Sequence, residues 1–145
     1  MPRILAVDWG RRRIGLALSD PLGIIATGLP TLEIRGEAEA VARVADTIRE
    51  VEADSVVVGL PLRLSGGKGD SAEAAERFAA KLHEVTGLPV SLFDERLTSV
   101  LALRRMQETG QRLRGRKGKL DQGAAVALLE GWLARLENER RKDDE

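Results

Sequence analysis

An aspartate interrupts the first apolar segment of the sequence. Asp8 lies between Val7 and Trp9 in RILAVDWG, residues 3–10, although aspartate is disfavoured in β-strands. An ionised carboxylate that is removed from water costs free energy unless it is paired, hydrogen-bonded or bound to a metal ion. Asp8 is therefore a candidate for a chemical role. The alternative is that its carboxylate caps a turn at the end of the strand.

A second group of charged residues follows another short apolar run. In FDERLTS, residues 93–99, Asp94, Glu95 and Arg96 come where a strand is predicted to end. Neighbouring residues on a strand point to opposite faces, so at most one of the two acids shares a face with another site. The alternative role is that of an acid at a helix start, where negative charge favours the helix dipole.

A third acid, Asp121, opens a long apolar segment directly after a basic one. Acids near the N-terminus of a helix are common and stabilise it by about 0.3–1 kcal/mol. Taken by itself, Asp121 would be assigned that role, so its interest depends on the other acids.

The basic residues are concentrated in one part of a chain that is neutral overall. The 145 residues include 23 basic and 23 acidic residues, yet basic residues outnumber acids eight to one between Arg96 and Lys119. Between Glu33 and Asp54 the balance is reversed, with seven acids and three arginines. Charge sorted in this way can produce a basic face on a neutral protein. The alternative is an ordinary solvated surface.

Composition predicts a single globular domain. Apolar residues make up 43% of the chain and aromatic residues 3%, and cysteine is absent, which removes disulfides and thiolate sites from consideration. We expect one domain over residues 1–138 and a charged tail, 139–145, that frays. The start of the chain is too short and too charged for a signal peptide, and no apolar run reaches membrane-spanning length. A cytoplasmic protein without a membrane partner is therefore expected.

The periodicity of apolar residues predicts the element order β-β-β-α-β-α-β-α-α. Three strands joined by short turns precede strands that alternate with helices, which indicates an α/β fold with a mixed sheet. Ser71 is a candidate cap for the second helix and Gly87 its stop. The expected strands are 3–10, 13–20, 24–34, 55–61 and 88–93, the expected helices are 36–54, 71–87, 97–110 and 120–139, and 111–119 is expected to be a loop.

Four motifs together resemble one protein family. They are IxAVDWGxxRIGLALSD near the N-terminus, VVVGLPLxxxG in the middle, then FDERLTS, and KGKLDQGAAVALLE near the end. In this order they are similar to the YqgF family, also called RuvX, whose members are described as pre-16S rRNA nucleases and as Holliday-junction resolvase-like proteins. The resemblance covers essentially the whole chain. Trp9 is a minor departure, since another aromatic or apolar residue is expected there.

The resemblance implies a ribonuclease H-like fold, with a five-stranded mixed sheet flanked by helices, and a catalytic site in which Asp8, Glu95 and Asp121 meet. Carboxylate ligands without cysteine or paired histidine suit Mg²⁺ or Mn²⁺ rather than zinc. Two such ions about 3.5–4 Å apart would support phosphodiester hydrolysis. We expect Asp8 to bridge the ions, and Glu95 and Asp121 to complete one coordination sphere each. Arg96 would orient an acid or touch a phosphate, and Asp94 would support the site from outside the ligand set or act as a cap.

A nucleic-acid partner follows from the same resemblance and from the basic residues. The loop 111–119 is the expected substrate arm, and the turn after Asp8 would add to the same face. Aromatic residues are scarce, so we expect recognition of shape and backbone rather than of bases. The expected nucleic-acid-binding residues are Arg11, Arg12, Arg13, Arg96, Arg112, Arg114, Arg116, Lys117 and Lys119.

Three functions remain open at this point. The first is a metal-dependent endonuclease that matures the 5′ end of pre-16S rRNA in ribosome biogenesis. The second is the same chemistry on branched DNA, as in a Holliday junction resolvase; symmetric cuts would then call for a two-fold homodimer. The third is a non-catalytic module that binds RNA or a ribosomal particle, which would bind tightly without metal-dependent turnover.

Overall fold

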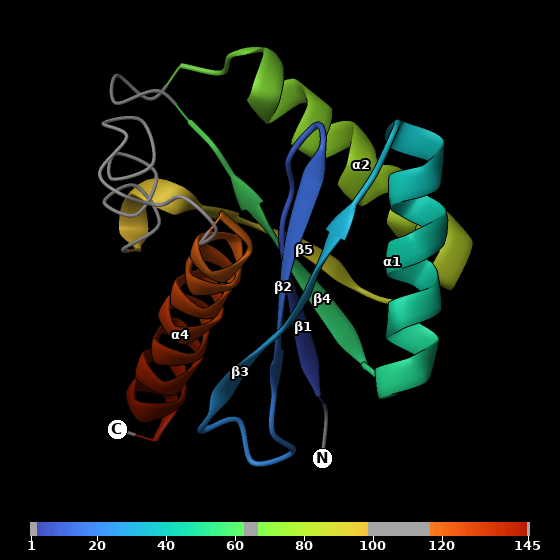
Figure 1. Cartoon of the computed structure of the whole chain (residues 1–145). Helices are drawn as coiled ribbons and strands as arrows, with labels where there is room; N and C mark the ends of the chain where they lie inside the picture. The colour runs from blue at the N-terminus through green and yellow to red at the C-terminus, as the bar shows by residue number, and fades with distance from the viewer. Residues whose placement is uncertain (1–2, 63–66, 99–116, 145) are drawn as a thin grey trace.

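Five strands form one mixed sheet in the order β3-β2-β1-β4-β5 (Figure 1). The structure, a computed structural model, describes residues 3–62, 67–98 and 117–144, and in the last segment the side chains from residue 123 onward. Strands β1 and β2 pair antiparallel, as do β2 and β3, whereas β4 pairs parallel with both β1 and β5. The predicted five-stranded mixed sheet is confirmed. The strands are β1 Ile4–Asp8, β2 Arg13–Ser19, β3 Ala26–Glu33, β4 Ser55–Leu60 and β5 Val90–Asp94.

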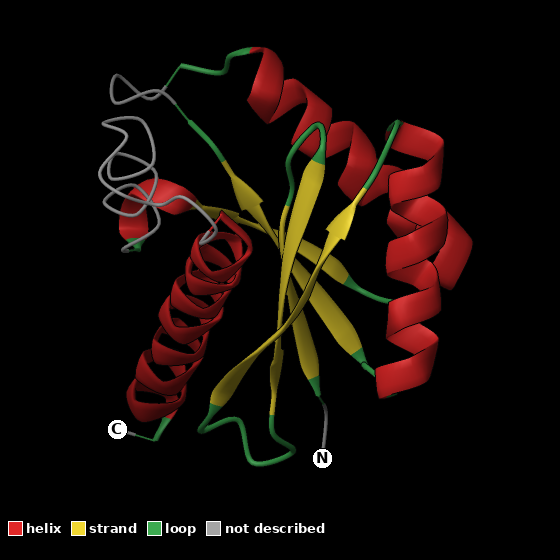
Figure 2. Ribbon diagram, in the orientation of Figure 1, coloured by secondary structure: helices red, strands yellow, loops and turns green. Residues whose placement is uncertain are grey.

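Helices cover both faces of this sheet (Figure 2). Helices α1 Glu37–Val51 and α2 Asp70–Thr86 pack on one face, where Leu5 and Val7 of β1 belong to the core. Helix α4 Lys117–Asp143 packs on the other face, against Ile4 and Ala6 of the same strand. Side chains of a strand alternate between faces, which is why β1 is apolar at every position before Asp8. In the part of the chain that the structure describes, no helix has the length and apolar character needed to cross a lipid bilayer.

The carboxyl ends of β1, β4 and β5 lie at the same end of the sheet, because these three strands are parallel neighbours. The chain leaves β1 toward β2 on one side, while β4 lies on the other side. In open α/β sheets, ligands bind outside the carboxyl ends of the strands at such a change of direction. We therefore expect a site at this end of the sheet. Asp8 lies there, because it is the last residue of β1.

Several helix ends differ from the prediction. Helix α2 begins at Asp70 after Gly69, so Ser71 lies inside the helix and is not its cap; the acids of its first turn favour the dipole instead. Gly87 ends this helix with a φ of 71°, as predicted. A 3₁₀ helix, η1 Glu95–Leu97, follows β5. The helix expected over 97–110 lies, from residue 99 on, outside the described residues.

The last helix is longer than predicted at both ends. It begins at Lys117, so residues 117–119 are helical and not part of a loop, and it continues to Asp143, so most of the tail 139–145 does not fray. Lysine is a good helix former even where no apolar period marks a helix. Near the C-terminus, ion pairs at helical spacing join Glu137 to Arg140 and Arg141, each at 3.5 Å. Such pairs and basic residues in the last turn stabilise a helix.

Candidate functional site

Asp8 ends the central strand and faces helix α4. Ile4 and Ala6 pack toward α4, so the alternation of the strand directs Asp8 to the same side. Only 7% of Asp8 is exposed. It takes part in at least one hydrogen bond, ion pair or other electrostatic interaction, as a buried carboxylate must if burial is not to be prohibitively costly. The sequence placed this acid in a strand, and the structure adds which face of the sheet it occupies.

Glu95 brings a second carboxylate to the α4 face. It is the first residue of η1 and is 1% exposed. Its carboxylate lies over the backbone of Gly59 in β4: a Cβ added at Gly59 would be 2.8 Å from Glu95 Oε1 and 3.3 Å from Leu128 Cδ2 of α4. The backbone of η1 is held by Thr98, whose hydroxyl donates to the Glu95 carbonyl at 2.9 Å. Glu95 is therefore enclosed between the sheet and α4.

Gly59 links the two acids. Val7 of β1 pairs with Val58 of β4, so Asp8 and Gly59 come next in the parallel register. Neighbouring strands are about 4.8 Å apart, and the Glu95 carboxylate occupies the space beside Gly59. Two buried carboxylates, 87 positions apart in the sequence, thus lie on one face at the carboxyl ends of β1 and β5, the strands on either side of β4.

Asp94 is occupied with Arg96. The Asp94 carboxylate caps η1 by accepting from the Arg96 backbone N–H at 2.9 Å, and it also accepts from the Arg96 guanidinium, with Nη2 2.7 Å from Oδ2. The side-chain hydrogen bond from Arg96 is the main cause that holds the pKa of Asp94 below its usual value, and the same pairing raises the pKa of Arg96. The two acids therefore differ: Asp94 forms a partly exposed ion pair with Arg96, and Glu95 is buried.

The remaining predicted site residues fall where the structure says less. Arg112, Arg114 and Arg116 lie outside the described residues, and Lys117, Lys119 and Asp121 belong to α4 without described side chains. Among the residues whose side chains are described, no group of three or more acids, histidines or cysteines could hold a metal ion. The meeting of Asp121 with Asp8 and Glu95 stays a prediction.

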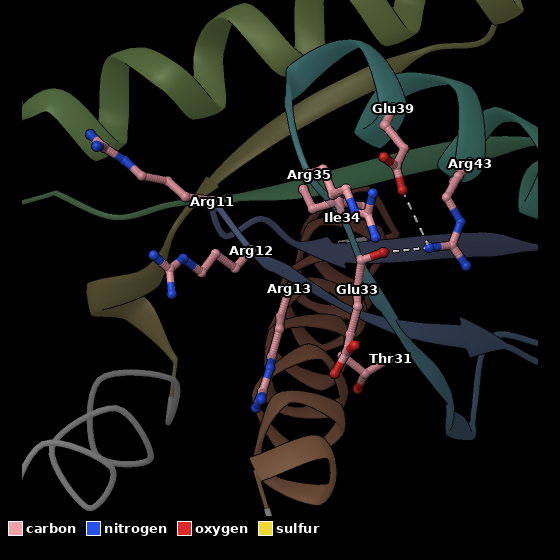
Figure 3. A pocket seen from close by; sticks show the side chains of 9 residues that line it. All are labelled: Arg11, Arg12, Arg13, Thr31, Glu33, Ile34, Arg35, Glu39 and Arg43. Carbon is pink, nitrogen blue, oxygen red and sulfur yellow. Dashed lines mark hydrogen bonds and ion pairs between the residues drawn. The ribbon is translucent and has the colours of Figure 1, made fainter.

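The predicted arginines of the β1–β2 turn line an open depression (Figure 3). Gly10 permits this tight turn, since a Cβ there would lie 2.5 Å from the Arg13 carbonyl oxygen. The depression has a volume of about 1260 Å³, and it also includes Arg35 and Arg43, which sequence reasoning missed because they belong to the acidic stretch 33–54. The signal in the sequence that could have found them is strand pairing. If strand 24–34 pairs antiparallel with strand 13–20, the residues that follow strand 24–34 lie beside the turn between the first two strands.

Comparison with known proteins identifies the family. The profile of a family described as "RuvX: Holliday junction resolvase" matches residues 2–135. A protein of Anaeromyxobacter dehalogenans (strain 2CP-C), named "Putative pre-16S rRNA nuclease", is 45% identical over 133 residues, which cover 92% of this chain and 97% of that protein. A protein of the same name from Koribacter versatilis (strain Ellin345) is 47% identical over 133 residues, which cover 92% of this chain and 87% of that protein.

Solved structures with low sequence identity share the fold. T. thermophilus RuvC in complex with a Holliday junction substrate has a TM-score of 0.60 at 18% identity, with 94% of this chain and 97% of that one covered. The Holliday junction resolvase of fowlpox virus has a TM-score of 0.52 at 13% identity, with 92% and 99% covered. These likenesses agree with the predicted ribonuclease H-like architecture. The family profile and the relatives at 45% and 47% identity lead to one conclusion: the chain belongs to the RuvX family.

Proposed function

We propose that this protein is a metal-dependent endonuclease that hydrolyses phosphodiester bonds of a nucleic acid. The observation that carries the proposal is the pair of buried carboxylates, Asp8 and Glu95, on either side of Gly59 at the carboxyl ends of β1, β4 and β5. A pair of buried acids with no catalytic or binding task would be an unneeded cost to stability. The name of the relatives, "Putative pre-16S rRNA nuclease", and the description of the family, "Holliday junction resolvase", support the same class of reaction.

The donor set fits Mg²⁺ or Mn²⁺, two ions in our proposal. Asp8 and Glu95 offer hard carboxylate oxygens, and cysteine is absent from the chain, which suits these ions better than zinc. Asp121 is the proposed third ligand. It precedes Ala125 by four residues and Leu128 by seven, a spacing that would put it on the same helical face as these buried residues. When bound, divalent ions lower the pKa of a water molecule and stabilise charge on the phosphate oxygens.

The protein's own residues would orient the substrate. Packing beneath Leu128 and beside Gly59 limits the positions that the Glu95 carboxylate can take, so little conformational freedom would be lost in the reaction. Arg96, held at the rim of the site by Asp94, would contact a phosphate or orient an acid. Arg11, Arg12 and Arg13 on the turn after Asp8, together with Arg112, Arg114, Arg116, Lys117 and Lys119, would bind the nucleic-acid backbone.

The substrate we propose is the 5′ region of the pre-16S rRNA, alone or in a ribosomal particle, processed in the cytoplasm. The names of the relatives at 45% and 47% identity support this choice. The composition agrees with backbone recognition, because the chain has two tryptophans, two phenylalanines and no tyrosine, and Phe78, Phe93 and Trp9 are buried. Few rings remain for stacking on bases.

Asp8→Asn tests the proposal directly. We expect metal-dependent cleavage of precursor rRNA to fall by on the order of 100-fold or more, since loss of an ion site removes several kcal/mol of transition-state stabilisation. Mg²⁺ or Mn²⁺ should raise the Tm of the wild-type protein, as a ligand of the folded state does, and should raise that of Asp8→Asn much less. Asp46→Asn, an exposed acid on α1, is the matched control. Undiminished cleavage by Asp8→Asn would rule out the site, and RNA binding without cleavage by the wild type would favour a non-catalytic module.

A second candidate is the same reaction on branched DNA. The description of the matching family as a Holliday junction resolvase favours it. A four-way DNA junction assayed beside precursor rRNA, each with Mg²⁺ and with Mn²⁺, separates the two substrates. Faster cleavage of the junction would replace rRNA by branched DNA in our proposal and leave the roles of Asp8 and Glu95 unchanged.

A further inference from the structure

The arginine-lined depression extends beyond the turn that follows Asp8. Its arginines come from four places: Arg11 and Arg12 from the turn, Arg13 from the start of β2, Arg35 from the segment between β3 and α1, and Arg43 from the second turn of α1. The Ile34 backbone N–H donates to the Arg12 carbonyl at 2.9 Å. This bond holds the segment that carries Arg35 against the turn that carries Arg12.

The depression follows the end of the edge strand β3 from one face of the sheet to the other. Arg13 pairs with Glu33 in the antiparallel register. Ile14, the next residue along β2, belongs to the core on the α1 side, so strand alternation directs Arg13 toward the α4 face, which also carries Asp8 and Glu95. Arg43 lies on α1, which packs on the opposite face. A nucleic-acid strand that leaves the acids could therefore continue around the end of β3 along these arginines.

The charge in the depression favours an anion with many charges. Arg11, Arg12 and Arg35 are exposed, and their guanidinium groups make no hydrogen bond or ion pair with any residue that the structure describes. Arg43 donates to the Glu33 carbonyl and lies 3.8 Å from Glu39 Oε1, and these two contacts are drawn as dashed lines in Figure 3. Among the described residues that line the depression, five are arginines and two are glutamates. A single phosphate would use only one or two of them, whereas a nucleic-acid strand carries a charge about every 3.4 Å along its axis.

The shape agrees with a polymer rather than a small molecule. The depression is open, and its volume of about 1260 Å³ exceeds the roughly 300–1,000 Å³ that is usual for small-ligand pockets. The described residues of its lining include Ile34 and no aromatic residue, so they offer cations without a surface for stacking a base. Cations without aromatic rings suit contacts to phosphates, which do not depend on the base sequence.

We propose that this depression binds the sugar–phosphate backbone of the substrate at a distance from the cut, with Arg35 and Arg43 as binding residues. The proposal rests on the proposed function for the identity of the anion. It adds two residues from a stretch of acidic composition, and it gives the direction in which the substrate leaves the acids: past Arg13, around the end of β3, to the start of α1. Arg35 and Arg43 should therefore affect binding of long substrates and not the chemical step.

The test is binding of a fluorescent single-stranded RNA, measured by anisotropy over a range of salt concentrations in EDTA. The Arg35→Ala, Arg43→Ala double variant should bind more weakly at low salt. Its log–log dependence on salt should be shallower by about 1.4, since each lost phosphate contact contributes about 0.7 for single strands. The control is the Arg49→Ala, Arg77→Ala double variant, which removes the same charge from exposed positions on α1 and α2 and should keep the wild-type slope. Equal slopes for the two double variants would overturn the proposal.

Two further variants keep the result interpretable. Arg35→Ala alone removes a side chain without a described partner, so weaker binding with an unchanged Tm supports a direct contact. Glu39→Gln removes a negative charge and the ion pair of Arg43, and should tighten binding; unchanged or weaker binding would count against the depression as an anion site. If polyglutamate of equal charge competes as well as RNA does, the surface suits an acidic protein and the proposal fails.

The failure of this inference can be told apart from the failure of the proposed function. Binding is measured without metal and without cleavage. If the wild-type protein cuts no substrate, but substitution of Arg35 and Arg43 weakens RNA binding, this inference stands and the proposed nuclease activity is refuted. A protein that cuts RNA with Mg²⁺ or Mn²⁺ but binds it independently of both arginines would retain the nuclease and refute this inference.

Discussion

At the scale of single residues, Gly59 leaves the space that the buried Glu95 carboxylate occupies. The motif VVVGLP puts glycine inside a buried strand, where it usually weakens the strand unless something approaches closely. Here the carboxylate of Glu95 and a methyl group of Leu128 occupy the place of the missing side chain. Asp8 lies on the next strand in the same row. The close approach of Glu95 therefore explains why glycine stands at position 59, because the backbone conformation there does not itself require glycine.

Gly59→Ala should reduce cleavage while the protein stays folded. The added methyl would lie 2.8 Å from Glu95 Oε1 and must displace a side chain that is 1% exposed. Overpacking of this kind costs about 1–3 kcal/mol of stability, and a catalytic group moved by about 1 Å can lose on the order of 100-fold in rate. The measurements are metal-dependent cleavage and urea unfolding. Gly36→Ala, where a Cβ meets no atom within 4 Å, is the control; equal activity of the two variants would contradict the role given to Gly59.

At the scale of elements, helix α4 lies very close to the end of β5. A Cβ at Gly131 would be 2.6 Å from Thr98 Cγ2 and 3.2 Å from Phe93 Cε2. Next to it, Phe93 and Trp132 meet edge to face, with ring centroids 5.4 Å apart, a geometry that aromatic pairs prefer. Thr98 in turn donates to the Glu95 carbonyl. The packing of α4 and the position of η1 are therefore coupled through Thr98.

A double-mutant cycle measures this coupling. Gly131→Ala gains about 1 kcal/mol of helix propensity but loses about 1–3 kcal/mol through overpacking, so we expect net destabilisation in urea unfolding. Thr98→Ser removes the methyl group that the new Cβ would meet and keeps the hydroxyl that donates to Glu95. In that background Gly131→Ala should be less harmful, by a coupling energy of about 0.5–3 kcal/mol. Additive effects of the two substitutions would show that α4 and η1 are independent.

At the scale of the whole molecule, the net charge is zero, but basic side chains gather at one end of the sheet. The arginines of the β1–β2 turn, Arg35 and Arg43 gather in one depression. At the other end of the sheet, the β2–β3 turn exposes Leu22, Ile24 and Ile25, and Asp20 holds that turn by accepting from the Ile24 and Ile25 backbone N–H groups at 2.7 and 2.9 Å. A polyanion would meet the molecule from the end that carries Asp8.

The oligomeric state distinguishes the two proposed substrates at this scale. Processing of one RNA end requires a single cut, so we expect the cleavage rate per molecule of protein to be independent of protein concentration, and a monomer in analytical ultracentrifugation. Resolution of a four-way junction requires two related cuts, for which a two-fold dimer is suited. A dimer whose dissociation abolishes cleavage would favour branched DNA over rRNA.

Much of the fold was predictable from sequence because the signals are local. The continuous apolar runs around Val7 and Val57 indicate buried strands, and the period of Val41, Val44 and Ile48 indicates a helix. Asp8 was identifiable because an acid at the end of an apolar strand contradicts the local pattern. The choice of Glu95 over Asp94 came from the family resemblance, since the local pattern left the two acids open. The ends of α4 were mispredicted, since ion pairs such as Glu137–Arg141 extend a helix without adding an apolar period.

Only the tertiary structure decided which distant residues share a surface. The pairing of β2 with β3, the turn at Gly10 and the hydrogen bond from the Ile34 N–H to the Arg12 carbonyl bring Arg35 beside Arg12. Part of an acidic stretch therefore forms one side of a basic depression. Likewise, the register between β1 and β4 puts Gly59 between Asp8 and Glu95. The types of these residues, and the elements that carry them, follow from short-range patterns in the sequence. Their proximity depends on long-range pairing between strands, which no local period records.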